Sequence, residues 1–93
     1  MTINNRQFPR EEVQIEVELE FLEDAARTVI TRDVSQGGLF MRLNDAEHYP
    51  MGEMVLMRFK HPLEDFKETV KDGVVVRQAA DGIAVAFIEM EEF

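Results

Sequence analysis

The chain contains no cysteine, no tryptophan and only two histidines among its 93 residues. The absence of cysteine excludes a disulfide framework and a thiolate metal site. His48 and His61 lack the HxH or HxxxH spacing of a transition-metal site, and neither lies near a serine or cysteine arranged as a nucleophile beside its base. We therefore expect both rings in solvated loops, and a protein that is not an enzyme and holds neither a metal nor a cofactor.

Basic side chains are also scarce, with ten Lys and Arg against nineteen Asp and Glu and a net charge of −9. Because duplex nucleic acid and anionic lipid bind through a basic footprint, this charge disfavours both as partners. No hydrophobic run approaches the roughly 18 residues of a membrane span, and the opening MTINNRQFPR has no apolar core of a signal peptide. These absences, with that of cysteine, favour a cytoplasmic protein without membrane insertion.

What is present suffices for one compact domain, because 45% of the residues are hydrophobic and seven are Phe. The charge is unevenly distributed along the chain. Residues 1–10 contain Arg6 and Arg10 but no acid, whereas residues 11–24 contain seven acids and no base. We expect a flexible basic arm over residues 1–12, followed by a folded domain over residues 13–93.

Alternation of apolar and polar residues predicts strands. From Val13 to Phe21 every second residue is apolar, which indicates a half-buried antiparallel strand. Further apolar, largely β-branched segments predict five more strands, over residues 26–34, 39–43, 54–60, 66–77 and 83–90. Gly73 is expected to mark a bulge or bend, and residues 35–38 a turn that uses positive φ at glycine. The loop over residues 44–52 has room for one helical turn.

Six strands separated by tight turns, with no long helical period, are typical of a small all-β sandwich or barrel. About ninety residues cannot cover two open sheets together with all their edges. The sequence therefore favours closure into a six-stranded antiparallel β-barrel with little helix.

The arm contains the pattern RxxxR, formed by Arg6 and Arg10. Pro9 excludes a regular helix here and biases Phe8 toward extended geometry. Guanidinium groups bind phosphate through paired hydrogen bonds and stack on purines, so two of them on one arm suit a nucleotide. The competing interpretation is an ordinary N-terminal tail, since this pattern alone also arises by chance.

Residues 33–38 form the pattern DxSxxG at the end of a predicted strand. Asp33 and Ser35 are two residues apart, so both should project to the same side of the sheet. A carboxylate accepts from the N–H edge of guanine, a hydroxyl both donates and accepts, and Gly38 lets a ligand approach the backbone. The competing interpretation is a plain hairpin, because Asp, Ser and Gly all favour turns.

Together, in this order, the two patterns resemble those of the PilZ family, the bacterial receptors for cyclic di-GMP. The resemblance extends over nearly the whole chain, because residues 73–77 and 82–87 are similar to the family's last two strands. It implies a six-stranded antiparallel barrel. It also implies that Arg6 and Arg10 hold phosphate and stack on guanine, and that the base-binding surface is lined by Asp33, Ser35 and Gly38.

This sequence departs from the family pattern in three places. Gln7 stands where many members have another basic residue, which is expected to weaken ligand binding. Ala84 stands where a second glycine is common, which we interpret as a packing detail. Many members carry a helix after the last strand, whereas this chain ends at Phe93. We expect one barrel end to be open to a partner protein or to a second copy in a homodimer.

The leading hypothesis is a stand-alone cyclic di-GMP receptor that orders its arm over the barrel and signals through an effector protein. The alternative is a ligand-free adaptor or scaffold that acts only by protein–protein interaction, against which the five intact motif residues argue. A barrel that binds single-stranded nucleic acid would need a basic groove with exposed aromatics, which the charge of −9 and the single Tyr disfavour.

Overall fold

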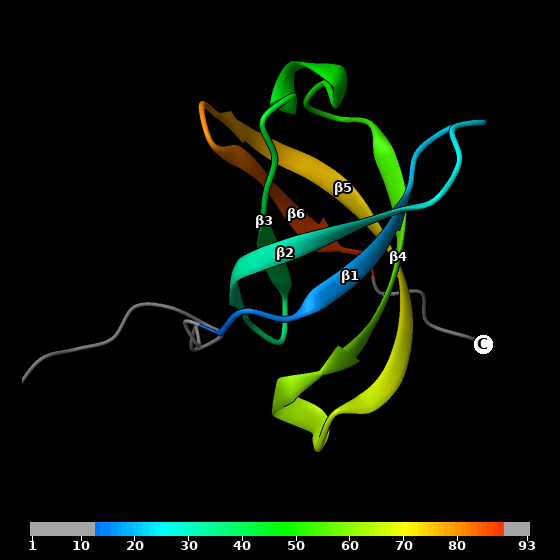
Figure 1. Cartoon of the computed structure of the whole chain (residues 1–93), viewed down its shortest axis with the longest axis vertical. Coiled ribbons are helices and arrows are strands. Elements are labelled where there is room, and N and C mark those ends of the chain that lie inside the picture. The colour runs from blue at the N-terminus through cyan, green and yellow to red at the C-terminus, as the bar shows by residue number, and fades with distance from the viewer. Residues whose placement is uncertain (1–12, 89–93) are drawn as a thin grey trace, which may run out of the picture.

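The computed structural model describes residues 13–88, which fold into six strands and two short 3₁₀-helices (Figure 1). The strands are β1 (Glu16–Glu20), β2 (Arg27–Val34), β3 (Gly38–Arg42), β4 (Met54–His61), β5 (Lys67–Ala79) and β6 (Gly82–Phe87). The 3₁₀-helices are η1 (Ala46–His48), between β3 and β4, and η2 (Pro62–Glu64), between β4 and β5. No helix within residues 13–88 is long and apolar enough to cross a membrane.

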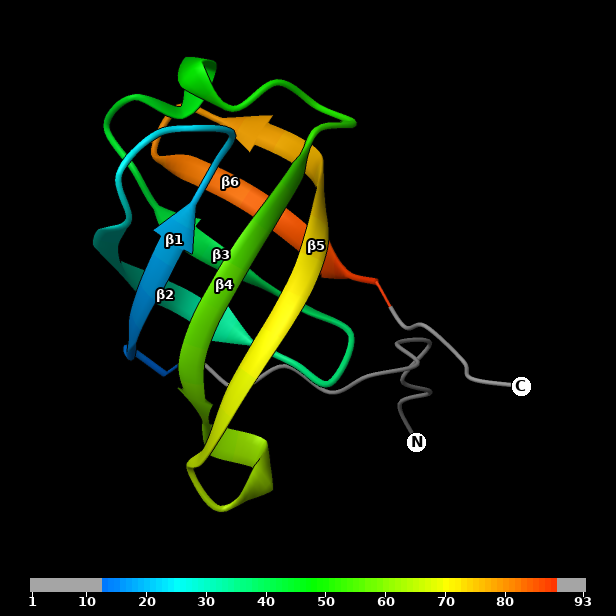
Figure 2. The ribbon, with the colours of Figure 1, turned by 90° about the vertical axis from the view of Figure 1, so that its right-hand side faces the viewer.

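The strands close into a barrel in the order β1–β2–β3–β6–β5–β4, and β4 pairs again with β1. Every pair of neighbouring strands is antiparallel. Figure 2 shows the two ends of the barrel: η1 lies over the upper end, and the β4–β5 hairpin with η2 projects from the lower end. The prediction of a closed six-stranded antiparallel barrel with little helix is confirmed.

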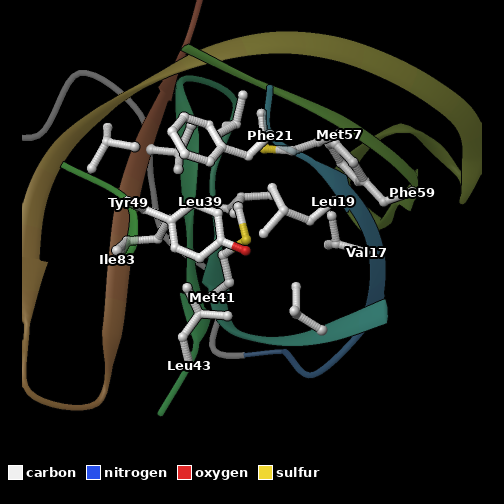
Figure 3. Close-up of a cluster of buried hydrophobic side chains, with 14 of the residues drawn as sticks. Val17, Leu19, Phe21, Leu39, Met41, Leu43, Tyr49, Met57, Phe59 and Ile83 are labelled. Carbon is white, nitrogen blue, oxygen red and sulfur yellow. The ribbon is translucent and has the colours of Figure 1, made fainter. Parts of the chain in front are cut away.

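The barrel interior is filled by the residues that alternation places on one face of each strand. Val17 and Leu19 of β1, with Phe21 directly after it, are at most 5% exposed, while Glu16 and Glu18 face solvent. Removing this apolar surface from water is the main term that stabilises the fold. Figure 3 shows these side chains beside others from across the barrel, among them Leu39, Met41, Met57 and Ile83.

Strand β1 begins three residues later than the alternation predicts. Over residues 13–15 the chain is held to β2 by the backbone bond from the Thr31 N–H to the Ile15 carbonyl oxygen (3.0 Å) and by the Thr31 side chain. The Thr31 hydroxyl donates to the Val13 carbonyl oxygen (2.7 Å) and accepts from the Ile15 N–H (3.0 Å). Val13 and Ile15 still pack against the core, so the inward face that the alternation predicts continues beyond the start of the strand.

Gly73 does not mark a bulge, contrary to the expectation from sequence. It pairs in register with both neighbouring strands, and a Cβ there would collide with Val85 Cγ1 and lie 2.7 Å from Met57 Cε. The barrel interior therefore requires a residue without a side chain at this position. The irregularity in β5 lies instead between Val75 and Arg77.

The loop that contains η1 lies over one end of the barrel, and η1 is the helical turn that the sequence allowed in this loop. The Gln78 side-chain amide donates to the carbonyl oxygens of Ala46 (3.0 Å) and Tyr49 (2.9 Å). Tyr49 is 2% exposed, and its ring lies 5.2 Å from that of Phe21. This end of the barrel is thereby covered by an aromatic side chain of the chain itself.

Candidate functional site

The DxSxxG residues lie around the turn that joins β2 to β3, toward the lower end of the barrel in Figure 2. The Ser35 hydroxyl donates to the Gly38 carbonyl oxygen (3.2 Å) and accepts from the Gly37 N–H (3.2 Å). The Ser35 N–H donates to the same Gly38 carbonyl (2.8 Å). This serine therefore builds the turn through its own side chain, and a hydroxyl lone pair remains to accept a further hydrogen bond.

Gly38 allows two strands to approach closely. A Cβ on this residue would collide with the carbonyl oxygen of Val85 and lie 3.2 Å from Ala86 Cα, both on β6. Within residues 13–88, the glycine that adopts positive φ is Gly52, in the loop before β4. The expectation of positive φ at a glycine of the β2–β3 turn is therefore wrong, because the neighbouring strand is what requires glycine here.

Asp33 belongs to a small cluster outside the barrel core. It pairs with Phe40 of β3, and the β2 ladder is irregular between Thr31 and Asp33. Arg32 Nε donates to Asp33 Oδ2 (3.0 Å), and the Arg32 guanidinium carbon lies 3.9 Å from the centre of the Phe40 ring. Phe40 is 2% exposed yet lies outside the interior cluster that contains Leu39 and Met41. Strand alternation therefore places its ring on the outside of the barrel, beneath the arginine.

From this cluster a row of paired residues continues around the barrel. Phe40 pairs with Ala84 of β6, and Ala84 pairs with the exposed Arg77 of β5. Ala86, two residues along β6, pairs with Gly38. We call this surface, around Asp33, Phe40, Ala84 and Arg77, the outer wall. Its central residues Ala84 and Ala86 have small side chains, and Arg32 and Arg77 place positive charge there in a chain with a net charge of −9.

His61 is buried at the end of β4. It is 1% exposed, its Nδ1 accepts from the Leu63 N–H (3.2 Å), and its ring lies 5.5 Å from that of Phe59 and 6.2 Å from that of Phe87. The expectation of a solvated loop is wrong for this histidine, because it is the last residue of β4 and alternation turns it inward. The prediction of a solvated loop is confirmed for His48, whose side chain is 51% exposed. Its Nε2 lies 2.7 Å from Asp24 Oδ2.

Burial lowers the pKa of His61, since desolvation penalises the charged ring. Glu64 raises this pKa through its charge, Lys71 lowers it, and a hydrogen bond with the backbone of Ser35 raises it. This last interaction connects the buried ring to the residue that builds the turn. The buried ring therefore lies close to the turn that carries the DxSxxG residues.

The structure brings together three of the five predicted site residues, namely Asp33, Ser35 and Gly38. Arg6 and Arg10, and the rest of the predicted arm, lie outside the described residues. Within residues 13–88 no group of three or more His, Asp or Glu is placed to hold a metal ion.

Arg32, Phe40 and Arg77 were not among the site residues expected from sequence, and His61 was expected in a solvated loop. Arg32 directly precedes the motif, and strand alternation in the segment GLFMR turns Phe40 outward, so these two had a usable pattern. Arg77 faces the outer wall only because of the irregularity in β5, which no sequence pattern marks. His61 precedes Pro62, which favours a loop and concealed the inward orientation of the ring.

Comparison with known proteins gives one family and one fold. The family model described as the PilZ domain matches residues 4–92. No curated protein matches the chain. Among solved structures, the chain is similar to the inhibitor of motility of Bacillus subtilis (MotI/DgrA), with a TM-score of 0.78 and 20% sequence identity. The match covers 96% of this chain and 45% of that one, so the likeness establishes a shared fold over less than half of the larger protein.

Proposed function

Since the chain belongs to the PilZ domain family, which binds cyclic di-GMP, we propose that it is a receptor that binds this dinucleotide on its outer wall. The observation that supports this most directly is the arrangement at the β2–β3 turn. Asp33, Ser35 and Gly38 lie there beside a surface that has small side chains at its centre and carries Arg32 and Arg77. Such a surface suits a planar, anionic ligand.

In this proposal Asp33 accepts hydrogen bonds from the N–H edge of a guanine, since a carboxylate is an acceptor only. Ser35 contributes the free lone pair of its hydroxyl at the turn. Gly38 lets β3 approach β6, and the small side chains of Ala84 and Ala86 let the base lie close to the backbone of β6. The residues beside the acceptor thus contribute chiefly by being small.

Arg6 and Arg10 are proposed to complete the site by gripping phosphate and stacking on guanine. Ordering the arm over residues 1–12 costs roughly 1–2 kcal/mol per residue in backbone entropy. Surface ion pairs with the acidic domain supply only about 0–1 kcal/mol each, which is too little to hold the arm without ligand. Contacts to the nucleotide offset this cost, so the arm becomes ordered over the barrel when the ligand binds.

The arm and the bound nucleotide then form a composite surface that an effector protein recognises. This role involves binding and not catalysis, and the proposal invokes neither a metal nor a cofactor. The competing function is a ligand-free adaptor that uses the same barrel only for protein–protein interaction. The intact acceptor Asp33 favours the receptor, because the fold of an adaptor does not require a carboxylate at this position.

Calorimetric titration of the purified chain with cyclic di-GMP, with single-stranded RNA as the control, tests this proposal. We expect saturable binding of cyclic di-GMP that weakens as salt is raised, because phosphate contacts are screened, and no binding of RNA. A folded chain that does not bind cyclic di-GMP would overturn the receptor function and leave the adaptor. Preferential binding of RNA would overturn it in favour of a nucleic-acid-binding barrel.

A further inference from the structure

Arg32 stands outside both sequence motifs, yet it is held by two independent contacts beside the candidate site. Its Nε donates to Asp33 Oδ2 at 3.0 Å, and its guanidinium carbon lies 3.9 Å from the centre of the Phe40 ring. Adjacent residues of a regular strand point to opposite faces, so the irregularity of β2 between Thr31 and Asp33 is what allows this pair to form. The backbone is thus shaped to place the arginine over the ring.

The surroundings of this side chain indicate which part of it remains available. Phe40 is 2% exposed, whereas the Arg32 side chain is 31% exposed and that of Asp33 is 10% exposed. The ring and the carboxylate are therefore largely covered, and the guanidinium is the accessible member of the cluster. Of its five N–H donors, one is used by Asp33.

We propose that Arg32 is a stacking platform, on which a purine base lies so that ring, guanidinium and base form three layers. This rests on the proposed function, because it assigns a further contact to the same nucleotide. A guanidinium is planar and stacks on aromatic faces, and Phe40 and Asp33 already fix its plane and its rotation. The remaining N–H donors are left to bind acceptors of the base or its phosphate.

The alternative is that Arg32 acts as a latch, which occupies Asp33 and must leave before a ligand binds. Departure would break both the ion pair and the contact with Phe40, and would uncover an aromatic ring that is now 2% exposed. A platform keeps both contacts and adds a third. Asp33 then has two tasks, since Oδ2 orients the platform while Oδ1 accepts from the base.

The test is titration of cyclic di-GMP into the full chain and its variants at Arg32. We expect Arg32→Ala to weaken binding by about 10- to 100-fold, the range of a stacking contact. Arg32→Lys should not restore it, because an ammonium group has no plane to stack. Arg58→Ala is the matched control: Arg58 is an exposed arginine of β4 that faces Glu18 at 3.8 Å, away from the outer wall, and its loss should leave affinity unchanged.

A spectroscopic signature separates contact from mere structural support. In the wild-type chain the Nε–H resonance of Arg32 should shift on addition of cyclic di-GMP, while that of Arg58 should not. If Arg32→Ala binds cyclic di-GMP with unchanged affinity, the platform is overturned. If it binds more tightly than wild type, Arg32 is the latch instead. If the wild-type chain does not bind cyclic di-GMP at all, the proposed function fails first and the platform fails with it. If the wild-type chain binds cyclic di-GMP and Arg32→Ala binds it equally well, the platform alone is rejected.

Discussion

Arg6 and Arg10 are the residues whose substitution should change ligand affinity without touching the barrel. We expect Arg6→Ala and Arg10→Ala each to weaken cyclic di-GMP binding by about 1.5–3 kcal/mol, the contribution of a charge-assisted hydrogen bond. Lysine at either position should not restore affinity, because its ammonium group neither forms a bidentate pair with phosphate nor stacks on a base. The measurement is calorimetric titration at one fixed salt concentration. Unchanged affinity in both alanine variants would remove these arginines from the site.

Asp33 offers a second prediction, which separates base recognition from turn formation. Asp33→Ala should weaken binding while changing the free energy of unfolding by no more than about 1 kcal/mol, since its partner Arg32 keeps its contact with Phe40. Thermal melting beside titration measures both quantities. Asp81→Ala, an exposed aspartate in the β5–β6 turn, is the control and should change neither. A variant that is less stable but binds normally once folded would assign Asp33 to the turn alone.

At the scale of single residues, the sequence could supply the motif but not the cluster around it. Asp33, Ser35 and Gly38 were recognisable because their spacing is fixed within one turn. Arg77 reaches the outer wall through pairing with Ala84, a contact between β5 and β6 across a register shift. Such partners follow from strand register, which a local pattern does not contain.

Among the elements, the β2–β3 hairpin depends on the closeness of β6. Gly38→Ala should lower stability by about 1–3 kcal/mol, because the added methyl group meets the carbonyl oxygen of Val85 and the strands must separate. In a domain of this size each kcal/mol corresponds to a decrease of about 4–8 °C in Tm, so thermal melting resolves the effect.

Gly52→Ala provides the comparison for that prediction. Gly52 has open space around its Cα, and the substitution is penalised only by its φ of 91°. Gly38→Ala should therefore weaken ligand binding as well as stability, whereas Gly52→Ala should affect stability alone. Equal affinity of both variants would show that the approach of β3 to β6 does not shape the site.

Strand positions were predictable from sequence because each buried face repeats every second residue. The irregularities were not, as β5 illustrates: Gly73 resembles a bulge residue but is required by Val85 and Met57 inside the barrel. The actual register shift, between Val75 and Arg77, lies in an unremarkable apolar segment. Both the need for glycine at residue 73 and the register shift in β5 depend on the width of the closed barrel. That width is set only when all six strands are assembled.

For the whole molecule, the buried His61 makes stability depend on pH. Its folded-state pKa is lowered chiefly by desolvation, so between that value and the unfolded value of 6.5 the unfolded chain binds more protons. Stability is therefore fully present above pH 6.5 and is lost as pH falls through 6.5 toward the folded-state pKa. Urea unfolding between pH 7.5 and about 5.5 measures this slope, above the range in which carboxylates titrate.

His61→Gln should remove most of that slope, because it takes away the buried ring. A slope that persists in His61→Gln would show that other groups control the pH dependence of the fold.

The central claim is that cyclic di-GMP binds the outer wall at the β2–β3 turn and orders residues 1–12 over it. Amide hydrogen exchange with and without cyclic di-GMP tests both parts together. We expect exchange to slow on binding at residues 2–10 and 32–40, and to be unchanged in the η1 loop at the opposite end. Strong protection of residues 2–10 in the free protein, or protection confined to the η1 loop, would contradict it.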